Sequence, residues 1–114
     1  MDIKVGEYVR TNEGIIDKVK DFSNYTSFYH CENGMIIDVY SKCATYLKDI
    51  VKHSFNIIDL IEVGDYVNGK YVEKINQYES GKSIIALIGI IDEEDIKSIV
   101  TKEQFESMEY KVGD

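Results

Sequence analysis

The 114-residue sequence contains no proline and no tryptophan, only two cysteines, and 13 Lys and Arg against 21 Asp and Glu. Two cysteines are too few for the disulfide framework of a small secreted domain, so both are expected to be reduced. The formal net charge of −8 repels a phosphate backbone, and no basic run is present to offset it. The composition therefore argues against direct nucleic-acid binding and favours a partner protein with a basic surface.

The sequence also lacks a long hydrophobic run. No apolar stretch reaches the roughly 18 residues needed to cross a bilayer, and the start MDIKVGEYVR has no apolar signal core. We therefore expect a cytoplasmic protein with no membrane partner. A hydrophobic content of 44% with 30% charged residues is typical of a folded chain, and this length suits one domain or two very small ones.

One pattern occurs twice: IKVGEYVRT at residues 3–11 and IEVGDYVNG at residues 61–69. These segments align at an offset of 58 residues, and a glycine turn follows each of them. DKV at 17–19 and EKI at 73–75 come next, at an offset of 56. We predict two related units, residues 1–60 with a connecting segment and residues 61–114 with a C-terminal helix.

Hairpins are predicted within each unit. Alternation of side chains with a period of two, as in Val5, Glu7 and Val9, predicts a strand followed by a turn and a second strand. The dipeptide NG at 33–34 and at 68–69 suits a two-residue hairpin loop. At 33–34 that loop pairs Phe28 with Val39 and His30 with Ile37, so we assign Phe28, Ile37 and Val39 to the core. Three residues then face outward: Tyr29, Asp38 and Tyr40.

The remaining segments predict a mostly β chain with one or two short helices. KCATYLKDIVKHSFNIIDLIE, residues 42–62, suggests a short helix or turn and then a strand around Ile57 and Ile58. SIIALIGII, residues 83–91, is apolar on both faces and predicts a central strand, or one covered by the other half or by another chain. TKEQ at 101–104 is a capping-box spacing that begins a helix at about 102–109, with Phe105 and Met108 packed on a sheet. Residues 110–112 are predicted to finish as a strand.

The repeated pattern VGD-Y-V, a glycine turn and EKI resembles the opening hairpin of SH3-like small barrels, including the KOW type of ribosomal and transcription proteins. The resemblance covers residues 3–20 and 61–76 and implies two SH3-like barrels or half-barrels packed together. KOW domains usually meet nucleic acid with basic loops. Here acidic residues occupy much of the equivalent ground, namely Glu7, Asp17, Asp65 and Glu73.

The strings IVKHSFNIIDLIEVGDYVNG and DIKSIVTKEQFESMEYKV resemble small accessory proteins of phages and prophages of low-GC Gram-positive bacteria. The resemblance covers residues 50–76 and 95–112. That class includes inhibitors of host defence, notably anti-CRISPR proteins. The resemblance implies an accessory role inside the host cell, and it carries no catalytic residues with it.

Metal and nucleophile chemistry have one candidate set: His30, Cys31, Cys43 and His53. It lacks the closely spaced ligand pairs of structural zinc sites, and adjacent strand residues such as His30 and Cys31 point to opposite faces. A pair of His53 with Cys43 stays open. There is no phosphate-cradling glycine loop or nucleophile elbow, so we expect no enzyme activity and no cofactor.

Two features suggest a binding surface. The acidic run Asp92, Glu93, Glu94 and Asp95 could imitate a row of phosphates in an Arg- or Lys-lined groove, although such runs are more often solvated turns. Tyr25, Tyr29 and Tyr40 could form an exposed patch, with a place in the core as the alternative.

We therefore expect a non-catalytic phage accessory protein that inhibits a host protein such as a defence nuclease effector. The alternatives are a homo-oligomeric phage assembly component that associates through strand 83–91, and a KOW-like nucleic-acid adaptor.

Overall fold

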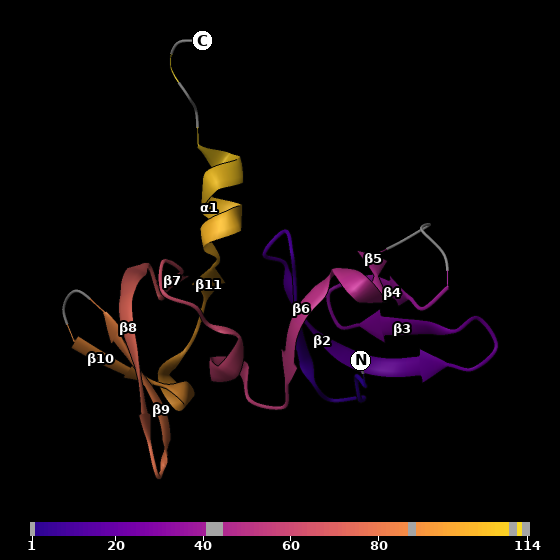
Figure 1. The fold of residues 1–114 in the computed structure, drawn as a ribbon, viewed down its shortest axis with the longest axis horizontal. Helices are drawn as coiled ribbons and strands as arrows, with labels where there is room; N and C mark the ends of the chain where they lie inside the picture. Colours follow the sequence, from indigo (N-terminus) through magenta and orange to yellow (C-terminus); the bar gives the residue numbers. More distant parts are fainter. Residues whose placement is uncertain (1, 41–44, 87–88, 110–111, 113–114) are drawn as a thin grey trace. The chain divides into compact units, whose positions relative to one another are not determined.

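The computed structural model describes residues 2–40, 45–86, 89–109 and 112, and it divides into two compact units, residues 1–60 and 61–114. Figure 1 colours the first unit from indigo to magenta and the second from magenta to yellow. Each unit is built around one β-sheet. Among the described residues, no helix is long and apolar enough to span a membrane.

The first unit contains a sheet of strand order β5-β4-β3-β2-β1-β6. All neighbouring strands are antiparallel except β4 and β5, which are parallel. Its elements are β1 (Tyr8–Thr11), β2 (Ile16–Ser23), β3 (Phe28–Cys31), β4 (Ile36–Asp38), β5 (Thr45–Tyr46), the 3-10 helix η1 (Leu47–Asp49), β6 (Ile50–Ser54) and the 3-10 helix η2 (Ile57–Leu60).

The second unit contains an antiparallel sheet of order β10-β9-β8-β7-β11. The helix α1 projects from one end of this sheet (Figure 1). The elements are β7 (Tyr66–Val67), β8 (Lys70–Tyr78), β9 (Gly81–Ala86), β10 (Gly89–Asp92), the 3-10 helix η3 (Glu93–Asp95), β11 (Ile99–Val100) and α1 (Lys102–Met108).

The prediction of a mostly β chain with a short C-terminal helix is confirmed. Closed barrels are not formed, because the two end strands of each described sheet do not pair with each other. Once β5 is set aside, both sheets have the same five-strand order. Counted along the chain, the first four strands of each sheet pair one after another, and the fifth strand pairs with the first. The orders are β4-β3-β2-β1-β6 and β10-β9-β8-β7-β11.

The repeated sequence forms the same turn in both units. Gly6 and Gly64 have φ angles of +97° and +99°, which glycine adopts without steric cost. The Gly6 N–H donates to the Val19 carbonyl at 2.8 Å, and the Gly64 N–H donates to the Val72 carbonyl at 3.0 Å. Strand β1 consequently begins only at Tyr8, and Val5 is half exposed rather than part of a strand face.

These bonds correct the alignment of the second strands. Val19 is the structural counterpart of Val72, at an offset of 53 residues, and not of Ile75 at 56. The bulges agree, since β2 shifts register between Val19 and Asp21 and β8 shifts between Val72 and Lys74. DKV and EKI therefore do not occupy equivalent positions in the two sheets. The offset falls from 58 at the glycine turns to 53 at the second strands, because the chain between them is five residues shorter in the second unit.

The NG dipeptides form different turns. At Asn68 and Gly69 both φ angles are positive, and Val67 pairs with Lys70, so the two-residue hairpin is confirmed. At 33–34 only Gly34 has a positive φ, and the Cys31 N–H donates to the Met35 carbonyl across a three-residue loop.

The longer loop at 32–34 shifts the register of the hairpin by one residue. Phe28 pairs with Asp38, Tyr29 with Ile37 and His30 with Ile36. Ile37 is buried as predicted, but the outward assignment of Asp38 and Tyr29 is wrong. Asp38 is 2% exposed, and Tyr29 packs against the core of the first unit. Phe28 and Val39 are only partly buried.

The apolar run 83–91 is not one strand. It folds back on itself as β9 and β10, with Ile84 opposite Ile91 and Ile85 opposite Ile90. Strand β9 is central, whereas β10 lies at the sheet edge. In residues 45–62 the expected order of a short helix and then a strand is confirmed by η1 and β6. The strand lies earlier than expected, because Ile57 and Ile58 belong to η2.

The capping box is confirmed. The Gln104 N–H donates to Thr101 Oγ1 at 3.3 Å, and the Thr101 N–H donates to Gln104 Oε1 at 3.1 Å. Phe105 packs on the sheet through Tyr66, with ring centroids 4.8 Å apart, whereas Met108 is 72% exposed. Of the strand predicted at 110–112, residues 110–111 lie outside the described part of the chain and Val112 is not in a strand.

Candidate functional site

The acidic run lies at the end of the edge strand β10 in the second unit. Asp92 ends β10, where its carboxylate accepts from the Ser83 hydroxyl at 2.9 Å, and the next three residues form η3. The Asp95 carbonyl accepts from the Asn68 side-chain amide at 2.8 Å, which ties η3 to the hairpin of β7 and β8. Asn68 thereby positions the acidic turn, although the sequence marks it only as a turn residue.

Three carboxylates of this turn come together. The ligand atoms of Asp92, Glu94 and Asp95 lie within 4.8 Å of one another, and all three residues are exposed. In the part of the chain that the structure describes, no other group of three or more potential metal-ligating side chains comes this close. An exposed acidic cluster is also an ordinary surface feature, so the geometry by itself defines a negative surface.

The three predicted tyrosines separate. Tyr25 is fully exposed in the turn between β2 and β3, and Tyr40 is 80% exposed just after β4. The Val39 N–H donates to the Ser27 carbonyl at 3.3 Å, which holds these two segments together at one end of the first unit. The Tyr29 hydroxyl instead donates to the Ile3 carbonyl at 3.1 Å.

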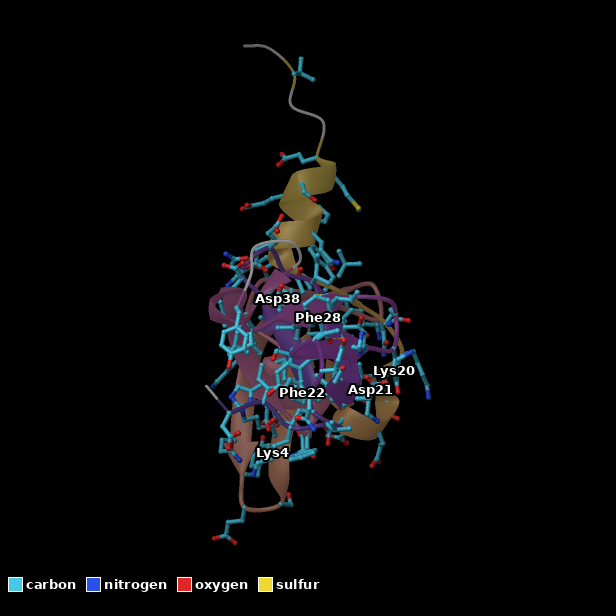
Figure 2. All side chains as sticks on the ribbon, turned by 90° about the vertical axis from the view of Figure 1, so that its right-hand side faces the viewer. Lys4, Lys20, Asp21, Phe22, Phe28 and Asp38 are labelled. Atoms are coloured by element: carbon cyan, nitrogen blue, oxygen red, sulfur yellow. The ribbon has the colours of Figure 1, made fainter. Side chains whose placement is uncertain are left out.

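A pair of aromatic rings on the first unit joins strands β2 and β3. Phe22 and Tyr29 are cross-strand neighbours with ring centroids 4.6 Å apart. The neighbouring pair, Asp21 and His30, projects from the opposite face of the sheet, with the carboxylate 2.7 Å from the imidazole Nδ1. Figure 2 looks onto this unit and labels Asp21, Phe22 and Phe28 on the two strands.

The metal-like residues do not converge where the structure describes them. His30 contacts Asp21, and His53 Nδ1 lies 2.9 Å from a carboxylate oxygen of Glu7. Cys31 is buried in the core of the first unit. Cys43 lies outside the described residues, so a pair of Cys43 with His53 stays open.

Cys31 is expected to be unreactive in the native protein. Burial, together with the negative charge of Asp17, raises the pKa of its thiol from 9.0 to about 12. In a Cys43→Ser variant, Ellman's reagent at pH 8 should label Cys31 only after denaturant is added. Because the raised pKa favours the neutral thiol, its contribution to stability is present below pH 9 and is lost as pH rises toward 12. Rapid native labelling would contradict this assignment.

Buried carboxylates stabilise the repeated turn. Glu7 accepts from the Lys4 N–H at 2.7 Å, and Asp65 accepts from the Glu62 N–H at 2.7 Å. Each also reaches a later element of its unit. Glu7 contacts His53 of β6, and Asp65 accepts from the N–H of Lys102, the first residue of α1, at 2.9 Å. These residues are 6% and 0% exposed, so their role is structural rather than partner binding.

A second aromatic group was not predicted. Tyr66 pairs across strands with Tyr71, with ring centroids 5.5 Å apart, and Phe105 stacks on Tyr66. The two-residue loop at 68–69 is the sequence signal for the first contact, because it places Tyr66 opposite Tyr71. The second contact depends on where α1 begins relative to β7.

No protein-family model, curated protein or solved structure matches this chain.

Proposed function

We propose that this chain is a non-catalytic accessory protein of the phage type that binds a host protein and inhibits it, with a nuclease effector of host defence as the intended class. The observation that carries the proposal is the distribution of charge. The second unit holds 12 of the 21 carboxylates and six of the 13 Lys and Arg, so it has a net charge of −6 and the first unit −2.

An acidic unit of this kind complements a groove that normally holds DNA or RNA. Charge complementarity speeds encounter and suppresses partners of like charge. Asp92, Glu94 and Asp95 supply closely spaced, exposed carboxylates at one sheet edge. Tyr25 and Tyr40 supply exposed aromatic area on the first unit. Tyr29 packs against the core of the first unit, so it is not part of this exposed area.

The proposal includes an SH3-like origin for both units. Its support is the shared five-strand order, the shared glycine turn, the shared bulge and a 3-10 helix before the fifth strand in each unit. Each unit would then be an open half-barrel that presents its loops for binding.

Affinity capture tests the proposed function. Tagged protein is incubated with host lysate, with and without nuclease treatment, and bound proteins are identified by mass spectrometry. A near-stoichiometric effector that survives nuclease treatment, and whose cleavage activity falls on addition of the protein, is expected. Partners lost on nuclease treatment would instead support a nucleic-acid adaptor.

Charge reversal at the acidic turn is expected to weaken binding to the captured partner. The Glu93→Lys/Glu94→Lys variant should bind at least about tenfold more weakly at low salt, and its affinity should depend less on salt. The control is Glu13→Lys/Glu32→Lys, which changes the net charge equally at exposed positions of the first unit. Equal losses of affinity in both variants would show that only the overall charge of the protein matters. Unchanged affinity in the Glu93→Lys/Glu94→Lys variant would show that the acidic turn does not contact the partner.

One observation favours assembly as a second candidate function. Strand β10 is an edge strand, and its Ile90 is 65% exposed, which is a ready site for pairing with a second copy. Light scattering across a hundredfold concentration range decides between the two functions. A concentration-dependent oligomer that Ile90→Lys abolishes, with no captured host protein, would favour assembly.

A further inference from the structure

The two units provide an internal comparison of one sheet face. In the second unit, Val100, Tyr66 and Tyr71 are cross-strand neighbours on β11, β7 and β8. In the first unit, the corresponding row on β6, β1 and β2 is Ser54, Tyr8 and Lys18. Paired residues of an antiparallel sheet project to the same face, so each row forms a strip of surface.

The fold does not require an aromatic side chain at the Tyr71 position of this row, because the first unit has Lys18 there. The buried apolar side chains of β1 and β2 are Val9 and Val19, and those of β7 and β8 are Val67 and Val72, all at most 1% exposed. The same strand order forms with lysine at position 18 and with tyrosine at position 71. The aromatic ring of Tyr71 is therefore not needed to form the sheet.

The helix α1 extends the aromatic row and leaves it open. Phe105 stacks on Tyr66, yet no residue of α1 is buried. Tyr71 and Phe105 remain 44% and 47% exposed, and Met108, one helical turn beyond Phe105, is 72% exposed. We call Tyr66, Tyr71, Phe105 and Met108 the aromatic surface.

The charges near the aromatic surface favour a cationic ligand. α1 and its C-cap carry Glu103, Glu106 and Glu109. The one lysine of the helix is already engaged, because Lys102 Nζ lies 2.7 Å from Glu62 Oε1. A partner that brings positive charge beside planar apolar area suits this surface, whereas a second copy, with its own net charge of −8, does not.

The first unit shows how a cation sits on this face. Lys18 Nζ lies 5.4 Å from the centre of the Tyr8 ring, at the position that Tyr71 occupies in the second unit. In the second unit the row contains no cation. A guanidinium group is the better match for this surface than an ammonium group, because it stacks flat on aromatic rings while it bonds to carboxylates.

We propose that the aromatic surface binds an arginine-bearing segment of the partner protein, with a guanidinium stacked on Tyr71 and Phe105 and the carboxylates of α1 beside it. This inference rests on the proposed function and names the chemistry of the partner. It also separates the aromatic surface from the acidic turn, which attracts any cation.

Synthetic peptides test the inference without knowledge of the partner. Nona-arginine and nona-lysine carry equal charge, so their affinities, measured by fluorescence anisotropy, differ only through stacking and hydrogen-bond geometry. We expect the whole protein to bind nona-arginine about fivefold or more tightly than nona-lysine. Equal affinities would overturn the proposal.

The decisive variant is Tyr71→Lys, which copies the residue of the first unit and so keeps a side chain that this fold accepts. It should lose the preference for arginine. Tyr78→Lys makes the same change at another exposed tyrosine of β8 and should keep the preference. Equal behaviour of the two variants would show that only charge matters and would overturn the proposal.

A further variant covers the case in which Tyr71→Lys releases α1. Met108→Ser alters an exposed side chain, so the melting temperature should not change while the affinity for nona-arginine falls about twofold to fourfold. Unchanged affinity of the Met108→Ser protein, together with a loss of helicity in the Tyr71→Lys protein, would overturn the proposal. The aromatic residues would then serve only to hold α1 on the sheet.

The two proposals fail in different ways. In one outcome, affinity capture recovers no host protein, while the protein still prefers nona-arginine to nona-lysine and this preference depends on Tyr71. That result would support the arginine-binding surface and contradict the inhibitor function. If a host effector is captured and Tyr71→Lys binds it as tightly as the native protein does, the function stands and the aromatic surface falls.

Discussion

Replacing Asp65 with alanine is expected to lower the free energy of unfolding of the second unit by about 2 to 5 kcal/mol, since it leaves two backbone N–H groups without their acceptor. The Asp65 side chain is fully buried, and its oxygens accept from the N–H groups of Glu62 and Lys102 at 2.7 and 2.9 Å. The loss therefore affects both the repeated turn and the start of α1.

The measurement is urea unfolding followed by two-dimensional NMR, because amide signals report each unit separately and the chain has no tryptophan to serve as a fluorescent probe. Signals of residues 61–109 should disappear at lower urea than in the native protein. Asp65→Asn, which keeps the shape and one acceptor oxygen, should lose less.

The first unit supplies a matched variant. Glu7→Ala removes the acceptor of only one backbone N–H, that of Lys4, and it also removes the contact with the partly exposed His53. Its cost should be smaller, about 1 to 3 kcal/mol, and confined to signals of residues 2–60. An Asp65→Ala protein as stable as the native one would show that water replaces the carboxylate at no cost.

The features that the sequence predicted correctly depend on local chemistry. The loop at 68–69 and the capping box at 101–104 each involve a few consecutive residues, and their backbone bonds form within that window. The repeated turn is local in the same sense, although its buried carboxylates also contact distant strands.

The features that were predicted wrongly depend on length and register. The NG at 33–34 looks the same as that at 68–69, but Asp17 accepts from the backbone N–H and the side-chain amide of Asn33 at 3.2 Å and stabilises the longer loop. That contact spans 16 residues, so the dipeptide alone does not reveal it. One residue of shift was enough to bury Asp38 and to pack the partly buried Tyr29 against the core.

The candidate surfaces follow the same division. The acidic run 92–95 is visible as composition, and the structure places it in an exposed turn. The aromatic surface requires knowledge of three strands and a helix, because Tyr66 meets Tyr71 through a hairpin and meets Phe105 through the position of α1. The comparison with Lys18 required the corrected offset of 53 residues between the second strands.

Truncating Ile84 tests how the apolar run folds. If residues 83–91 form the hairpin of β9 and β10, the run has one buried face, with Ile84 fully buried and Ile91 6% exposed opposite it. Ile84→Ala should then cost about 2 to 5 kcal/mol, because it removes buried methyl and methylene groups and leaves a cavity. The loss should appear as a lower urea midpoint for the second unit.

Ile90→Ala is the matched control in the same run. Its side chain is 65% exposed at the sheet edge, so truncation should change the free energy of unfolding by about 0.5 kcal/mol or less. A single central strand, apolar on both faces, predicts comparable losses at the two positions. Equal losses of unfolding free energy for Ile84→Ala and Ile90→Ala would therefore show that another surface covers Ile90. If diluting the protein then removed the loss for Ile90→Ala but not for Ile84→Ala, the covering surface would belong to a second copy of the chain.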